Sequence, residues 1–162
     1  EGAIAAQRYR AARALAHPFG ADARALDAKL AAAEDPRLAQ AVTPWLIGAS
    51  DPAEAVASLA RSEAPLARYL LARARLARGA PAEAMASLRG LDVAALPGPE
   101  LEVEARRMAA EALCLAGHPD AAIAAFAAIA RGAATEALRA QAEDAARRCA
   151  FERDARAAPA SR

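Results

Sequence analysis

The sequence predicts an all-α protein built from antiparallel helix hairpins, and three observations lead to this prediction. Apolar residues recur at helical intervals, and no stretch shows the sustained alternation of a β-strand. Prolines preceded by capping residues mark several helix starts. The octapeptide PAEAVASL at residues 52–59 returns as PAEAMASL at residues 81–88. A segment written twice in this way indicates a structural unit that the chain repeats.

Composition supports this fold class and excludes several functions. The 162 residues suffice for one domain, residues 1–162, and the hydrophobic fraction of 56% contains only 4% aromatics. Alanine supplies the excess; it favours helices but buries little area, so neighbouring helices must approach closely. A net charge of +1 gives no strong field for nucleic acid, and no apolar run is long enough to span a bilayer. The excess of alanine and arginine is typical of high-GC bacteria.

Each expected helix follows from local start and stop signals. Asp35-Pro36, Thr43-Pro44 and Asp51-Pro52 each place a capping side chain before a proline, and Glu54 completes a capping box at the third site. The segment Leu96-Pro97-Gly98-Pro99 ends one helix and begins the next. The expected helices, about eight or nine in all, span residues 2–16, 21–34, 36–48 (interrupted near Pro44), 52–61, 65–78, 81–90, 99–116, 119–131 and 134–157.

The octapeptide belongs to a longer pattern that explains its repetition. Gly79 and Gly117 each begin the sequence Gly-x-Pro-x-x-Ala-x-x-x-apolar, and the copy at Pro52 keeps its alanine and its leucine. Glycine can end one helix and proline can begin the next. The alanine lets the paired helix approach, and the large residue fills the remaining space. We therefore expect stacked helix-turn-helix hairpins.

This pattern resembles the tetratricopeptide repeat (TPR). The first match runs through Leu71, Ala72, Gly79, Ala84 and Leu88, and the second through Ala109, Ala110, Gly117, Ala122 and Phe126. The sequence departs from the family at four positions, where it has Arg75, Leu113, Leu91 and Ile129, and its copies are not 34 residues apart. The resemblance implies a right-handed superhelical stack with divergent helices at 1–50, TPR-like hairpins at 51–133 and a capping helix at 134–157.

The resemblance also implies a function: a non-catalytic scaffold or adaptor that holds a protein or peptide segment in a concave groove. Aligned on the turn glycines, the groove would contain Tyr69, Arg73, Glu104, Arg107 and Glu111. The helix at 65–78 carries four arginines and no acidic residue, which suits a carboxylate-bearing or extended partner. The alternative for these arginines is a solvated face whose side-chain stems cover apolar surface.

A second resemblance gives an alternative function. Residues 44–79 look like the helical, non-catalytic segments of soluble lytic murein transglycosylases, so the chain would be an accessory domain of an enzyme whose catalytic domain lies outside it. Both alternatives favour the bacterial periplasm or cell envelope over the cytoplasm. The chain begins Glu1-Gly2, which suggests a processed protein or a piece of a longer one. A third possibility is self-association into a homo-oligomer.

A search for catalytic or metal-binding residues gives no candidate, so we expect no enzyme activity and no cofactor. His17 and His118 lie at expected helix ends without a second ligand at metal-binding spacing. The acidic and basic residues at 100–107 read as a solvated helix face. Trp45 belongs to a core stripe with Leu38, Val42 and Leu46.

Cys114 and Cys149 fall late in two helices that a stacked array would place side by side. Cys149 continues an apolar stripe, which favours two small buried hydrophobic residues over a disulfide or a metal pair.

Overall fold

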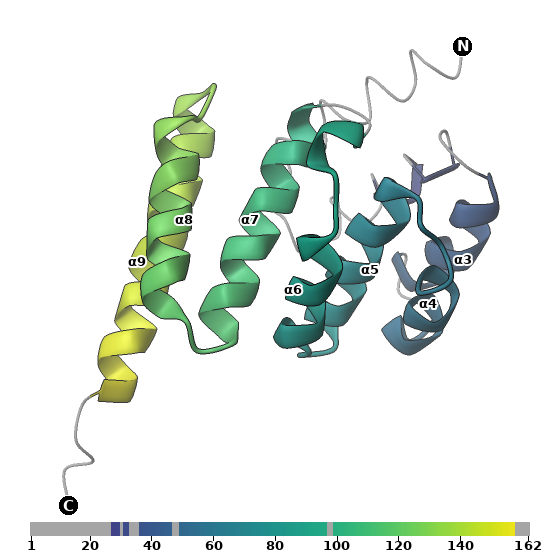
Figure 1. Cartoon of the computed structure of the whole chain (residues 1–162), viewed down its shortest axis with the longest axis horizontal. Coiled ribbons are helices and arrows are strands. Elements are labelled where there is room, and N and C mark those ends of the chain that lie inside the picture. Colours follow the sequence, from purple (N-terminus) through teal and green to yellow (C-terminus); the bar gives the residue numbers. More distant parts are fainter. Residues whose placement is uncertain (1–26, 30, 33–35, 47–48, 97–98, 158–162) are drawn as a thin grey trace, which may run out of the picture. The chain divides into compact units, whose positions relative to one another are not determined.

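The computed structural model describes residues 27–29, 31–32, 36–46, 49–96 and 99–157 (Figure 1). Within these ranges the chain forms helices and no strand, so the all-α prediction is confirmed. The helices are α3 (Pro36–Leu46), α4 (Pro52–Leu59), α5 (Pro65–Ala77), α6 (Pro81–Arg89), α7 (Pro99–Leu115), α8 (Pro119–Arg131) and α9 (Glu136–Ala157). A short 3-10 helix, η1 (Val93–Ala95), was not predicted. The helix expected at 2–16 and most of that at 21–34 lie outside the described residues, although 27–29 and 31–32 are helical.

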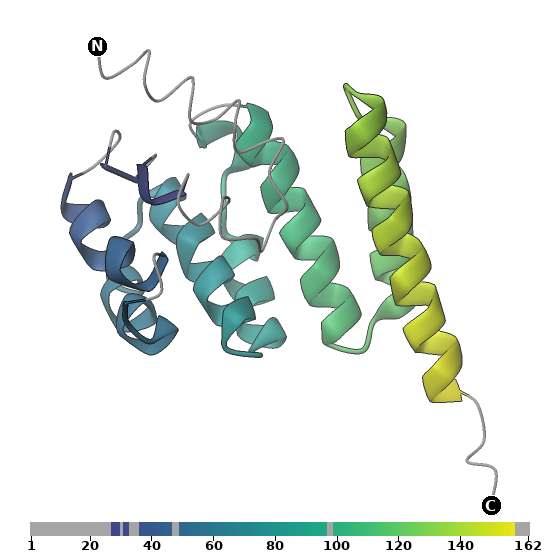
Figure 2. The same cartoon turned by 180° about the vertical axis from the view of Figure 1, so that it is seen from behind.

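The chain forms two compact units, residues 1–105 and 106–162, and the boundary falls inside α7. In the first unit α3 packs against α4, α4 against α5, and α5 against α6, so neighbours in sequence are neighbours in space. Figures 1 and 2 show these helices side by side from opposite directions. In the second unit α8 and α9 lie against each other along their length. Within each unit, the short connections make the packed consecutive helices antiparallel.

The two turns that begin with glycine have the same geometry. Gly79 and Gly117 have φ angles of +71° and +87°, in the left-handed region that glycine adopts most readily. The Gly79 amide donates to the Leu76 carbonyl (2.9 Å), and the Ala80 amide donates to the Arg75 carbonyl (2.9 Å). Gly117 and the residue after it bond in the same pattern to Cys114 (3.1 Å) and Leu113 (2.9 Å). These two hydrogen bonds around a left-handed glycine identify the Schellman motif at both sites.

The next helix also begins identically after each turn. Ala80 precedes Pro81 with φ −110° and ψ 65°, and His118 precedes Pro119 with φ −112° and ψ 58°. Neither capping residue contributes a side-chain hydrogen bond, so proline and backbone geometry start both helices. The sequence placed His118 at a helix end, and the structure places it at the N-cap of α8.

The alanine of each repeated copy is fully buried, as the close-approach argument requires. Ala55, Ala84 and Ala122 expose no surface. The large residue four positions later is buried at Leu59 and Phe126 but only half-buried at Leu88. Because a methyl group occupies little space, a longer side chain at the alanine positions would separate the helices.

Helix α3 confirms the core stripe predicted around the tryptophan, since Leu38, Val42, Trp45 and Leu46 are all buried. The predicted interruption at Pro44 is not a break, because α3 continues through this residue. The Pro44 carbonyl accepts hydrogen bonds from the amides of Ala49 (2.7 Å) and Ser50 (3.2 Å). The helix ends at Leu46, two residues after the proline, and the Pro44 carbonyl accepts its hydrogen bonds from amides that lie beyond the helix end.

The cysteine prediction is half right. Cys114 and Cys149 are buried, as expected, but they form a disulfide with a Cα–Cα distance of 5.9 Å, so the unpaired alternative is wrong. The bond lies in an apolar cluster that joins α7, α8 and α9. The buried members of this cluster are Ala110, Cys114, Ala122, Phe126, Ala145 and Cys149. In the sequence, periodicity placed Cys149 on an inward face and the expected stacking placed the two helices side by side, but neither decided between two unpaired cysteines and a disulfide.

Candidate binding site

Two of the predicted groove residues lie in the interior of the first unit. Tyr69 exposes no surface, and Arg73 exposes 3%. The Nη1 atom of Arg73 lies 2.5 Å from a carboxylate oxygen of Asp27, which is also buried. A buried guanidinium requires such a partner, because an isolated charge in the interior is strongly unfavourable. Tyr69 and Arg73 therefore expose almost no atoms that a binding partner could contact.

The other three predicted groove residues lie on α7. Glu104 is buried, which corrects the prediction that it belongs to a solvated face. Arg107 is half-buried and donates from Nη1 to the Gln141 Oε1 atom (3.0 Å), and Glu111 is half-buried. Tyr69, Arg73 and Glu104 belong to the first unit, and Arg107 and Glu111 to the second. One groove containing all five therefore stays a prediction.

The other arginines of α5 line a hollow that the sequence did not reveal. The hollow has a volume of about 240 Å³ and lies among the end of α4, the loop after it, α5 and α6. Its polar wall comes from Ser62, Glu63, Arg68, Arg75 and Ser87. Leu71 and two alanines, Ala60 and Ala86, complete the lining. We call this feature the arginine hollow.

Arg75 crosses the turn at Gly79 to reach α6. Its Nη1 atom donates to the Ser87 hydroxyl (2.5 Å) and to the Glu83 carbonyl (3.1 Å), and the Ser87 hydroxyl donates to the same carbonyl (3.2 Å). Its Nε atom lies 3.5 Å from the Glu83 carboxylate and is buried without a hydrogen-bond partner among the described residues. Among the described residues, Arg75 thus forms its hydrogen bonds through Nη1, and its Nε–H group forms none.

Arg68 occupies the other side of the arginine hollow. It donates from Nη1 to the Gly90 carbonyl (2.9 Å) and pairs through Nη2 with the Glu63 carboxylate. A Cβ atom at Gly90 would lie 2.5 Å from the Arg68 Nη1 atom, so the absence of a side chain there permits this contact. The remaining polar residue of the lining, Ser62, accepts a hydrogen bond from the Ala64 amide (3.3 Å).

Part of this arrangement was accessible from the sequence. Arg75 and Glu83 are each four residues from Gly79, on opposite sides, and a tight antiparallel turn brings such positions together. The contact of Ser87 with Arg75 follows from the next turn of α6. No sequence signal indicated the contact between Asp27 and Arg73, because these two residues are 46 positions apart and belong to different helical segments.

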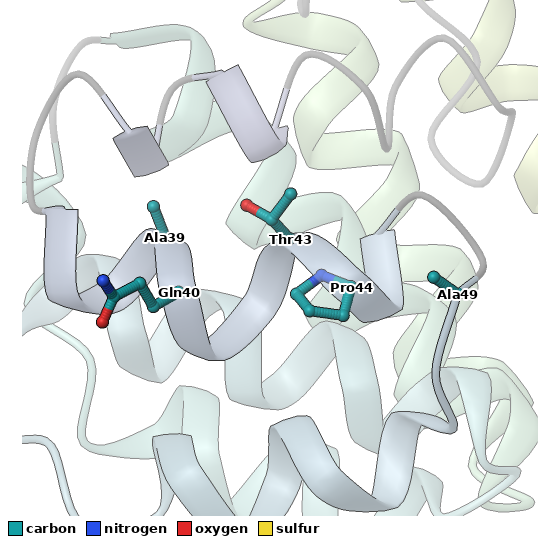
Figure 3. Close-up of a pocket in the computed structure, with 5 residues that line it drawn as sticks. All are labelled: Ala39, Gln40, Thr43, Pro44 and Ala49. Atoms are coloured by element: carbon teal, nitrogen blue, oxygen red, sulfur yellow. The ribbon is translucent and has the colours of Figure 1, made fainter.

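A second hollow, of about 450 Å³, lies beside the proline of α3 (Figure 3). It is lined by Ala39, Gln40, Thr43, Pro44 and Ala49. Proline has no amide hydrogen, so it cannot donate to the Gln40 carbonyl four residues earlier. None of the described residues that line it is charged, and this makes the arginine hollow the stronger candidate for recognising a polar ligand.

In the second unit, Arg153 joins α9 to α8. It donates to the carboxylates of Asp154 (2.8 Å) and Asp120 (2.9 Å). Hydrogen bonds to Asp154 and then to Asp120 raise the pKa of Arg153 above its ordinary value, so this side chain keeps its charge at any physiological pH.

Among the described residues there is no group of three or more histidine, cysteine and acidic side chains suited to holding a metal ion. No helix in the described part of the chain is both long and apolar enough to cross a membrane. Comparison with protein-family models, with curated proteins and with solved structures finds no match for this chain.

Proposed function

We propose that this chain is a non-catalytic scaffold or adaptor that binds a peptide or protein segment of a partner. The observation that supports this function best is the repeated hairpin, in which the turns at Gly79 and Gly117 share φ angles, hydrogen bonds and the proline that follows. Repeated hairpins of this type resemble the TPR, whose stacked helices present a rigid surface. A preformed surface lowers the ordering cost of capturing a flexible segment.

The polar groups at the surface of the first unit suit this function. Arg68 and Arg75 line a hollow on α5 and present guanidinium groups that carboxylates recognise in a fork geometry. The groove predicted from Tyr69, Arg73, Glu104, Arg107 and Glu111 is retained as part of the proposal with a changed role. The buried members of this set would position the helices, and surface groups would contact the partner.

Photo-crosslinking tests the proposal. A benzophenone amino acid at Ala86, beside the arginine hollow, should capture a specific protein from the source organism, and the same group at Arg139 on α9 serves as the control. The captured protein is then purified, and its saturable binding to the chain is measured by calorimetry. Failure of every purified candidate to bind would contradict the adaptor function.

A second candidate function is an accessory domain of a peptidoglycan lytic transglycosylase. The disulfide between Cys114 and Cys149 favours it, because disulfides persist mainly in oxidising compartments such as the bacterial periplasm, where peptidoglycan is found. The same observation is compatible with an adaptor in cell-envelope assembly. Sedimentation with isolated peptidoglycan sacculi separates the two functions, since an accessory domain should sediment with them and a protein adaptor should stay in solution.

A further inference from the structure

The size of the arginine hollow limits what it can hold. Its volume of about 240 Å³ is below the range of about 300–1,000 Å³ typical of sites for drug-sized ligands and cofactors. A nucleotide or a sugar chain would not fit inside it, whereas one side chain of a peptide would. The polar wall contains two guanidinium groups, so the side chain that it suits best carries a negative charge.

Both arginines retain hydrogen-bond donors for such a group. Arg75 uses Nη1 for its contacts with α6, and its Nε atom has no hydrogen-bond partner among the described residues. Arg68 uses its two terminal nitrogens, and its Nε atom is left over. The hydroxyl of Ser62 accepts a bond from a backbone amide and can still donate its hydrogen. A carboxylate has two oxygens and about four acceptor positions, which these donors can fill.

The chain's own glutamates now occupy the charge-pairing positions. Glu63 pairs with Arg68 and has 85% of its side chain exposed, and Glu83 lies 3.5 Å from Arg75 with 61% exposed. Exposed ion pairs of this kind contribute little to stability, because water screens them and the side chains lose freedom when paired. Either glutamate can therefore swing into solvent at small cost, and this would leave its arginine open to an incoming carboxylate.

We propose that the arginine hollow binds the side-chain carboxylate of an Asp or Glu in a partner's peptide segment, with Arg68 and Arg75 as the cationic contacts. The incoming carboxylate displaces Glu63 and Glu83. This inference rests on the proposed adaptor function, which it deepens by naming the chemical class of the recognised residue. Ser87 and the Gly90 carbonyl are positioning groups, since they orient the two guanidinium groups without contacting the ligand.

The test uses short peptides and the ¹⁵N-labelled full chain. Acetyl-Ala-Ala-Glu-Ala-Ala-amide is titrated at low ionic strength while the arginine Nε–H signals are followed by NMR. The signals of Arg68 and Arg75 should shift saturably, and the matching Gln peptide should leave them unchanged. A third peptide, with five alanines and a free C-terminal carboxylate, should bind at least threefold more weakly than the Glu peptide. Stronger binding of the third peptide would overturn the assignment to a side chain.

Two pairs of variants give opposite expected results. Arg68→Gln with Arg75→Gln should weaken binding of the Glu peptide at least tenfold, whereas Arg78→Gln with Arg89→Gln should change it less than twofold. The control arginines lie at the C-terminal ends of α5 and α6, and the charge removed is the same as in the tested pair. Glu63→Gln with Glu83→Gln should strengthen binding severalfold, because the displaced groups are gone. The control for this pair is Glu54→Gln with Glu143→Gln, which should raise affinity less than twofold.

A further variant keeps both arginines. Gly90→Ala should weaken binding severalfold, because the new Cβ atom would collide with the Arg68 Nη1 atom. Circular-dichroism melting establishes that each variant is folded.

Equal effects of the variant pairs and their controls would overturn the proposal, and so would weaker binding after loss of Glu63 and Glu83. If a purified native partner binds the Arg68 and Arg75 variant normally, the adaptor function stands and this site is wrong. If the Glu peptide binds as expected but no protein partner exists, the site stands and the adaptor function is wrong.

Discussion

The hairpin formed by α5 and α6 and the hairpin formed by α7 and α8 have the same turn but are held together by different chemistry. Four residues before the turn glycine, the first hairpin has Arg75 and the second has Leu113. Eight residues after it, the first has Ser87 and the second has Ala125. In the first hairpin these positions form hydrogen bonds, and in the second they pack against the apolar cluster around the disulfide.

This difference shows that two turns with the same backbone geometry can join helices that are held together by different contacts. Gly79 and Gly117 need only a residue that tolerates positive φ, and this requirement is local. The contacts between the paired helices are free to be polar or apolar. The polar version leaves charged donors near the surface, where they can serve recognition, whereas the apolar version with a disulfide contributes stability alone.

The largest expected effect concerns the buried ion pair of the first unit. Arg73→Met should lower the free energy of unfolding by about 3–5 kcal/mol, because it leaves the Asp27 carboxylate buried without its partner. Urea denaturation followed by circular dichroism measures the loss. The double variant Arg73→Met with Asp27→Leu should recover most of it, and equal instability of the single and double variants would contradict this interpretation.

The disulfide of the second unit comes next. Cys114→Ala with Cys149→Ala should lower the free energy of unfolding by about 2–4 kcal/mol, since a loop with a sequence separation of 35 is no longer closed in the unfolded chain. The urea midpoint gives the change. Dithiothreitol should destabilise the natural chain by a similar amount and leave the double variant unaffected. An unchanged midpoint in the double variant would show that the crosslink contributes nothing.

The turn glycines should respond alike in both hairpins. Gly79→Ala and Gly117→Ala should each cost about 1–2 kcal/mol, because alanine disfavours the left-handed region even though the space is open. Gly132→Ala is the matched control, since φ is −91° there and the new Cβ would make ordinary contacts. Thermal melting gives the comparison. Clearly unequal costs at Gly79 and Gly117 would mean that the two turns are not equivalent.

The smallest effect concerns the serine of the first hairpin. Ser87→Ala should cost about 1 kcal/mol, because the hydroxyl joins Arg75 to the Glu83 carbonyl. Hydrogen exchange of the amides of α6 should quicken, while exchange in α8 should stay as it was. Faster exchange in both helices would indicate a general loss of stability rather than the loss of this contact.

The helices were predictable because their signals are local. Prolines at helix starts and glycines at helix ends placed α4 to α8 within about two residues of their observed bounds. The buried faces followed from periodicity, as Ala84, Ala122 and Trp45 illustrate. Pro44 was misread as an interruption because a single proline can sit inside a helix when its lost hydrogen bond lies near the end.

The candidate site was less predictable because it depends on contacts across the chain. The sequence identified α5 as rich in arginine, but it could not tell the buried Arg73 from the surface-lining Arg68 and Arg75. Arg73 and Arg75 are two residues apart and therefore lie on different faces of α5, about 200° from each other around the helix axis. Asp27, which pairs with the buried Arg73, is distant in sequence. The disulfide was not the favoured prediction for the same reason, since periodicity indicates on which side of a helix a cysteine lies but not which residue it contacts.

The crosslink between α7 and α9 also has a mechanical consequence. A chain pulled at both ends in an optical trap extends by about 3.4 Å for each residue released, but the segment between the cysteines, which have a sequence separation of 35, does not carry the pulling force. About 120 Å of contour length is therefore withheld until a reductant opens the bond, and α8 bears no load while it is closed.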